Sequence, residues 1–227
     1  MCGRFVQTSS AQRLAQRFEA TDVTQHPVGA RCNVAPSTPV PAVIDVDGRR
    51  LGSLRWGFVP SWSRTPDDGP RPINVRVEGA ATSRLFAPSL ARRRCVVPVD
   101  AWYEWTDEEG ARQPWLLRPS SDGPVAVAGL WSVWRSPDAP HDVPNLSTVA
   151  LMTTEAHGPA ADVHHRMPLL VPDDLLDVWL DLRAPADASL LAELAARPVA
   201  VDVVRVSRRV NDVRNEGPEL LEPDAAS

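Results

Sequence analysis

Twenty-three prolines, spread through 227 residues, limit most strongly what this chain can fold into. Proline interrupts helices and removes a hydrogen-bond donor from strands, so it confines regular structure to short segments. Between the prolines, short apolar and β-branched runs predict strands. These runs lie at 40–46, 51–56, 94–99, 102–105, 114–117, 125–131, 146–152 and 201–206. The segment 105–110 follows one of them and predicts a hairpin turn.

Three segments predict helices, at 10–19, 173–181 and 187–196. The first has Ser10 as its N-cap and places Leu14 and Phe18 one turn apart. Helices and strands do not alternate along the chain, so the pattern indicates an α+β fold and argues against a doubly wound parallel sheet.

The chain contains no convincing linker and no internal repeat. We therefore expect one compact domain over residues 1–222. The end of the chain is acidic from Pro218, and we expect it to fray, with 223–227 as a tail outside the domain.

Charge and cysteine content exclude several classes of protein. All 24 basic residues are arginine and the net charge is −5, which argues against binding nucleic acid through the overall field. A nucleic-acid site would have to be a local basic groove. Three cysteines without a CxxC pair argue against a disulfide framework and a zinc ribbon, and favour a reducing cytoplasm. No apolar run approaches the ~18 residues of a membrane span, so we expect no membrane partner.

Cys2 is the first candidate for chemistry. If Met1 is removed, Cys2 carries a thiol and a free α-amine on one carbon skeleton. The amine condenses with an aldehyde to an imine, and the thiolate closes on the imine carbon to form a thiazolidine ring. Cys2 is thus a candidate covalent nucleophile or aldehyde trap. On its own, a small residue after Met1 is more often fortuitous.

Asn74 and Glu104 are the next candidates. The amide of Asn74 can donate to and accept from a substrate oxygen, and Arg76 would share its face of an extended segment. On local sequence alone, an asparagine at this place is more commonly a turn residue. Glu104 lies between large aromatic residues. It is either solvent-facing on an alternating strand or a carboxyl in an apolar wall with a raised pKa, which would suit general acid–base catalysis.

His164 and His165 are adjacent. Two histidines without a further ligand at close spacing make a poor metal site, so we expect no metal and no other cofactor. An imidazole that moves a proton near neutral pH is the better interpretation.

An aromatic and arginine-rich stretch follows residue 55. Stacking side chains interleaved with guanidinium groups suit single-stranded nucleic acid. We expect Trp56 to be core and Trp62, in a long loop at 56–72, to be the stacking residue. The run 92–94 (RRR) is equally compatible with a basic groove and with a solvated turn. No glycine-rich phosphate loop is present, which leaves nucleotide hydrolysis without support.

Taken in order, these segments resemble the SOS-response-associated peptidase family, whose members process abasic sites in DNA. The resemblance rests on 1–5 (MCGRF), 33–36 (NVAP), 56–62 (WGFVPSW), 74–78 (NVRVE), 81–84 (ATSR), 94–98 (RCVVP), 102–105 (WYEW), 164–168 (HHRMP) and the pairs 206–207 and 210–211. Each segment is weak alone, but their order and spacing together are specific.

The resemblance implies a fold and a set of roles. The fold would be a compact α+β domain with a curved, mostly antiparallel, barrel-like sheet and peripheral helices. Cys2, exposed by self-catalysed loss of Met1, would form a thiazolidine with the aldehyde of an abasic site. Asn74 would hold Cys2 and the opened sugar. Glu104 would be the acid–base group, and His164 would move the proton on the sugar hydroxyl.

The same resemblance implies the partner. Arg4, Arg76 and Arg166, with Trp62, would line a groove for single-stranded DNA that contains abasic sites. The protein would be a monomeric bacterial enzyme of the cytoplasm, engaged on the nucleoid, with peptidase activity on its own Met1 and a possible lyase activity.

Two other functions remain open. An N-terminal-nucleophile glutamine amidotransferase would also use Cys2, but it leaves Trp62, Arg76 and the 164–168 segment without a role. A non-enzymatic module for single-stranded DNA would explain the arginines and tryptophans but not the combination of Cys2, Glu104 and His164.

Overall fold

Five strands close into a barrel at the centre of the computed structural model, which describes residues 2–24, 29–120, 123–136 and 145–224. In order around the ring they are β4 (Pro39–Asp45), β5 (Arg49–Trp56), β11 (Leu146–Glu155), β10 (Val125–Trp134) and β7 (Arg94–Val99). Four of the five contacts are antiparallel, and the parallel contact between β5 and β11 closes the ring. Closure leaves these strands without an unpaired edge.

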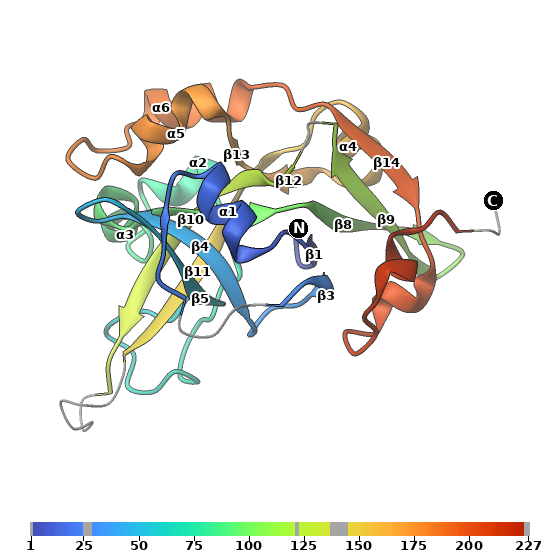
Figure 1. The fold of residues 1–227 in the computed structure, drawn as a ribbon, viewed down its shortest axis with the longest axis horizontal. Helices are drawn as coiled ribbons and strands as arrows, with labels where there is room; N and C mark the ends of the chain where they lie inside the picture. The colour runs from blue at the N-terminus through green and yellow to red at the C-terminus, as the bar shows by residue number, and fades with distance from the viewer. Residues whose placement is uncertain (1, 25–28, 121–122, 137–144, 225–227) are drawn as a thin grey trace.

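A second, fully antiparallel sheet packs beside the barrel. Its strands, in order, are β14 (Val201–Arg205), β9 (Ala111–Pro119), β8 (Ala101–Glu108), β1 (Phe5–Gln7) and β3 (Arg31–Val34). The turn between β8 and β9 uses Glu109 and Gly110 at positive φ, 53° and 79°. This is the hairpin that the segment 105–110 predicts. In Figure 1, β1 lies in the middle of the molecule, with the barrel on one side and β8 and β9 on the other.

The barrel strands carry apolar side chains on both faces. One face packs on α1 (Ala11–Arg17), α2 (Val77–Ala80), α3 (Ala87–Arg92), α5 (Asp173–Leu180) and α6 (Ala188–Ala196), which gather on one side of Figure 1. The other face forms a second cluster with Cys2, Phe5 and Trp102. Neighbouring residues alternate between the two, as Val96 and Val97 do.

Short elements complete the fold: β2 (Thr21–Asp22), β6 (Asn74–Arg76), α4 (Pro159–Val163), β12 (Arg166–Pro168), β13 (Leu170–Val171), and two 3-10 helices, η1 (Arg208–Asn211) and η2 (Pro218–Leu221). Within the described ranges, no helix combines the length and the apolar character needed to cross a membrane.

The predicted fold class is confirmed: the structure is an α+β fold built on a curved, mostly antiparallel barrel with peripheral helices. Ser10 caps α1 as predicted, accepting a hydrogen bond from the Arg13 N–H. Each predicted strand and helix coincides with an observed one, apart from its ends.

Two details of the sequence analysis need correction. The chain does not fray from Pro218, because Leu220 is fully buried and Pro223 forms a β-bridge with Val206. Residues 225–227 of the expected tail lie outside the described ranges.

Arg94 belongs to neither a groove nor a solvated turn. It is fully buried, and its guanidinium donates to four backbone carbonyls, those of Leu90, Trp179, Asp181 and Ala184. Arg94 therefore joins β7 to the end of α5, and this satisfies a buried charge that would otherwise be very costly.

Candidate active site

Cys2 is held in the interior by the strand that follows it. Phe5 in β1 lies opposite Trp102 in β8, and its ring packs 5.1 Å from that of Trp56. Because β1 and β8 are antiparallel, the residues before Phe5 run alongside those after Trp102, and Glu104 is close enough for its charge to act on the Cys2 thiol. The Cys2 side chain is 1% exposed. Burial raises the pKa of its thiol, and the charge of Glu104 adds to the increase.

Asn74 fixes the backbone of Cys2. Its side-chain Nδ2 donates a hydrogen bond of 2.8 Å to the Cys2 carbonyl. The backbone of Asn74 is held in place by β6, which pairs in parallel with β11. The indole N–H of Trp56 also donates to the carbonyl of the preceding residue, Ile73. The Asn74 Oδ1 atom is buried and has no hydrogen-bond partner among the described residues. It is thus an acceptor available to a ligand hydroxyl or amine.

Glu104 is the carboxyl in an apolar wall. It is 2% exposed, in β8 between Tyr103 and Trp105. Burial raises its pKa to about 7. A carboxyl with this pKa is divided between acid and base near neutral pH, so it can both donate and accept a proton.

His164 ends α4, which packs against β8 and β12. His164 Nδ1 lies 3.0 Å from the backbone nitrogen of Arg166 and 3.1 Å from its carbonyl oxygen, so the Arg166 backbone fixes the direction of the ring. The ring of His165 stacks on it, with 4.3 Å between centroids. Burial lowers the pKa of His164, which favours the neutral form. Ala160 and Met167, on either side of this segment, share the apolar cluster that holds Cys2.

Arg166 and Arg4 are engaged inside the protein. Arg166 is 8% exposed and makes a two-pronged ion pair with Glu78, at 2.7 and 3.0 Å. Arg4 Nη1 donates to Asn33 Oδ1 and to the Val210 carbonyl, at 2.8 and 2.9 Å. These contacts favour roles in shaping the site.

Trp62 and Arg76 face solvent. Trp62 is 70% exposed, while Trp56 is fully buried, as expected. The loop around Trp62 is fixed by the indole N–H of Trp134, which donates to the Ser63 carbonyl at 2.7 Å. Arg76 is exposed at the end of β6, two residues after Asn74, and the intervening Val75 is buried. Of the four expected DNA contacts, these two are therefore accessible.

The structure thus brings Cys2, Asn74 and Glu104 together, with the His164 segment beside them. A thiol, an amide with a free acceptor and a carboxyl poised near neutral pH can hold a carbonyl compound and move its protons. The described residues contain no group of three or more His, Cys, Asp or Glu side chains that could hold a metal ion.

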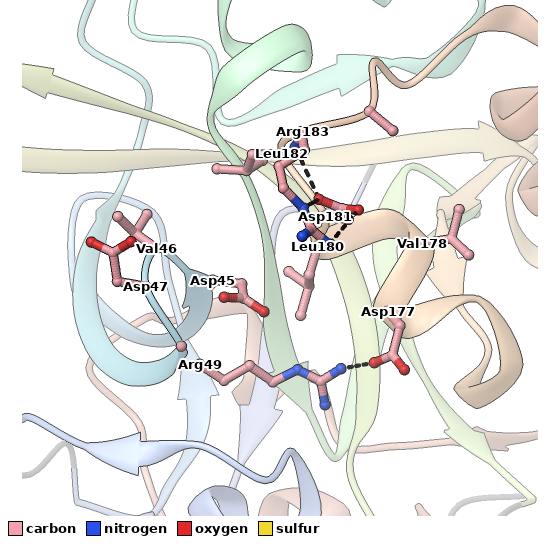
Figure 2. Close-up of a pocket in the computed structure, with 12 residues that line it drawn as sticks. Asp45, Val46, Asp47, Arg49, Asp177, Val178, Leu180, Asp181, Leu182 and Arg183 are labelled. Atoms are coloured by element: carbon pink, nitrogen blue, oxygen red, sulfur yellow. Dashed lines mark hydrogen bonds and ion pairs between the residues drawn. The ribbon is translucent and has the colours of Figure 1, made fainter.

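The open hollow shown in Figure 2 is a different feature. It lies between the β4–β5 turn and the end of α5, where Arg49 pairs with Asp177 and Arg183 pairs with Asp181. None of the candidate site residues lines it.

Sequence reasoning gave no role to Glu78 and Arg112. Glu78 stands within the 74–78 segment, but nothing in the sequence indicates that it pairs with Arg166. Arg112 is exposed in β9, and its guanidinium lies 5.0 Å from the centre of the Trp105 ring. Its charge also acts on Glu104. The predicted hairpin is the sequence signal that could have found Arg112, because β9 pairs with β8 and brings Arg112 near Glu104.

The protein-family model for "SOS response associated peptidase (SRAP)" matches residues 1–213. Relatives that match over almost the full length include two bacterial proteins. Abasic site processing protein YoqW of Bacillus subtilis is 32% identical over 98% of this chain and 99% of its own. Abasic site processing protein YedK of Escherichia coli is 32% identical over 98% of this chain and 100% of its own.

A solved structure has the same fold. A protein from Bacteroides thetaiotaomicron superposes with a TM-score of 0.84, covers 98% of this chain and 100% of its own, and is 18% identical. At this identity the likeness concerns the fold alone.

Proposed function

The chain belongs to the SOS response associated peptidase family, and we propose that it processes abasic sites in DNA by bonding to them covalently through Cys2. One observation carries the proposal: the buried Cys2 is fixed by Asn74 beside a carboxyl whose pKa is about 7. An aldehyde exposed by a ring-opened, base-less deoxyribose is the substrate that such an N-terminal aminothiol can trap.

The reaction proceeds in two bond-forming steps. The Cys2 amine adds to C1′ of the aldehyde, and the carbinolamine loses one water to give an imine. The Cys2 sulfur then adds to the same carbon, the thiol gives up its proton, and the former imine nitrogen takes one up. The product is a thiazolidine that joins the protein to the DNA and prevents the β-elimination that breaks the strand.

Each step needs a proton to move. Glu104 donates to the departing water and accepts from the thiol, which is protonated at neutral pH because burial raises its pKa. Asn74 holds the Cys2 backbone and offers its free Oδ1 to the amine or to a sugar hydroxyl. His164 moves the proton of the sugar hydroxyl through Nε2 as the ring opens.

The amine must be free before the first step. We propose that Met1, which lies outside the described residues, is removed by the site itself, and that the same residues support a lyase reaction on an opened adduct. Asn74, which holds the Cys2 carbonyl, and Glu104, whose charge acts on the Cys2 thiol, are the groups that would assist that removal.

We propose single-stranded DNA as the substrate form. Trp62 is exposed for base stacking, and Arg76 is exposed for a phosphate. Arg4 and Arg166 are bonded to internal partners, so their role would be to shape the DNA-binding surface and not to contact phosphates. The acidic protein thus relies on a local contact surface.

The proposed function is tested by mixing the untagged protein with single-stranded DNA that contains one abasic site. We expect an adduct that survives denaturant. Reduction of the aldehyde to an alcohol beforehand is expected to prevent it, because an alcohol cannot form an imine. Binding without any adduct would instead favour a non-enzymatic DNA-binding module.

Trp62→Ala and Arg76→Ala are expected to weaken DNA binding in different ways. Loss of stacking should cost about 1–3 kcal/mol and leave the salt dependence unchanged. Loss of one phosphate contact should flatten the slope of log affinity against log salt by about 0.7, equally for all sequences. Titrations at several salt concentrations measure both quantities.

Arg183→Ala is the matched control for charge, because Arg183 is an exposed arginine on the rim of the hollow in Figure 2. It should leave affinity and slope unchanged. A Trp62 variant that changes only the slope, or an Arg183 variant that equals Arg76→Ala, would reject this contact surface.

A further inference from the structure

The two terminal nitrogens of Arg166 donate hydrogen bonds to two residues, Glu78 and Thr153. Its Nη1 and Nη2 atoms pair with the two carboxylate oxygens of Glu78, and Nη2 also donates to the Thr153 carbonyl at 2.7 Å. Its side chain is only 9% exposed, whereas that of Glu78 is 55% exposed. A guanidinium so enclosed needs its carboxylate, because removing one partner leaves a buried charge without compensation.

The backbone of this same arginine orients the candidate proton carrier. The backbone N–H and the carbonyl oxygen of Arg166 both lie within hydrogen-bond distance of His164 Nδ1, at 3.0 and 3.1 Å, and these contacts fix the direction of the imidazole. Arg166 also begins β12, where it lies opposite Glu155 of β11. The position of the His164 ring therefore depends on the position of Arg166, and Glu78 holds Arg166 in place.

Glu78 belongs to a different segment from His164. It lies in α2, which follows directly on β6, the strand that presents Asn74 to Cys2. The hydrogen bonds from Arg166 lower the pKa of Glu78, so the carboxylate is ionised at neutral pH. The ion pair spans 88 residues of sequence and joins the segment that holds Cys2 to the segment that carries His164.

We propose that Glu78 is a positioning residue for the reaction, acting through Arg166 on His164. The inference deepens the function proposed above and rests on it. Glu78 acts without itself contacting Cys2 or DNA. Its effect appears in the rate of the bound complex and depends on the presence of His164.

Glu78→Gln tests the inference under single-turnover conditions with saturating abasic DNA. We expect adduct formation or its reversal to slow by about 10- to 100-fold, the order of loss that follows small misplacement of a reacting group. Affinity for DNA should stay at the wild-type value. Glu108→Gln is the control, because Glu108 also accepts from one arginine through both carboxylate oxygens, here from Nη1 of Arg205 in the second sheet. It should react at the wild-type rate.

A double-mutant cycle separates positioning from a general structural effect. In a His164→Ala background, Glu78→Gln should cause no further loss of rate, since the group it positions is gone. Glu78→Asp, which keeps the charge on a shorter side chain, should react at a rate between those of wild type and Glu78→Gln. It also supplies the test if Glu78→Gln does not fold.

Three results would overturn the inference. They are wild-type rates for Glu78→Gln and Glu78→Asp, losses from Glu78 and His164 that multiply independently, and a loss of DNA affinity with an unchanged saturating rate. Failure of the proposed function is distinct, because wild type and Glu108→Gln would then form no adduct at all.

Discussion

Replacing Cys2 with alanine is expected to reduce the denaturant-stable adduct below detection. The alanine variant keeps the α-amine and can still form an imine, but no sulfur closes the ring. The open imine returns to aldehyde and amine or proceeds to strand cleavage. A gel under denaturing conditions, with labelled abasic DNA, measures the remaining adduct.

Cys2→Ser refines this prediction. Serine offers a hydroxyl, a much weaker second nucleophile than a thiolate, so we expect only a labile adduct that borohydride reduction can trap. Cys32→Ala is the matched control, since Cys32 is another buried, unpaired thiol. It should crosslink like wild type. A heat-stable adduct in Cys2→Ala, or its loss in Cys32→Ala alone, would place the nucleophile elsewhere.

Glu104→Gln is expected to slow adduct formation by about 100-fold at saturating DNA, with little change in affinity. Positioned acid–base groups contribute about 100- to 10,000-fold, and the lower end applies because Cys2 retains its own nucleophiles. The wild-type rate should change around pH 7, where Glu104 titrates. The variant should lack this change, and single-turnover rates across pH test it.

The same substitution should stabilise the protein above pH 7. Glu104 keeps its proton up to about pH 7 when folded but loses it near 4.5 when unfolded. The unfolding free energy of the wild type therefore falls as pH rises between these values, by about 3 kcal/mol. Glu104→Gln does not lose stability in this way, because glutamine has no proton to release over this pH range.

Denaturant titrations at about pH 5 and about pH 8 compare the two proteins across this interval. A slower but more stable variant would support a role in chemistry. A variant destabilised at both pH values would indicate that Glu104 serves the fold.

The sequence predicts the parts of the fold that rest on local patterns. The long apolar runs of β7, β10 and β11 and the capped helix α1 are found where expected, because their signals lie within single segments. Strands β1 and β3 were not predicted. They have three and four residues, and only their pairing with each other and with β8 makes them strands.

The site divides in the same way. Cys2 and Glu104 could be singled out by their chemistry and their neighbours, and the resemblance of ordered motifs supplied their roles. The structure shows that Glu104 is buried and not solvent-facing. The sequence could not decide this, because only pairing with the rest of the sheet determines which face of β8 is buried. The partners of Arg4 and Arg166 were not predictable, because Val210 and Glu78 lie 206 and 88 residues away along the chain.

The central claim is that Cys2, freed of Met1, joins the abasic site through both its amine and its thiol. Mass spectrometry of the purified adduct, before and after digestion to the N-terminal peptide, tests it most directly. The account predicts a protein without Met1, joined to the oligonucleotide with loss of one water, and the sugar remnant on the peptide that begins at Cys2. An adduct that retains Met1, or a remnant on a peptide that lacks Cys2, would contradict it.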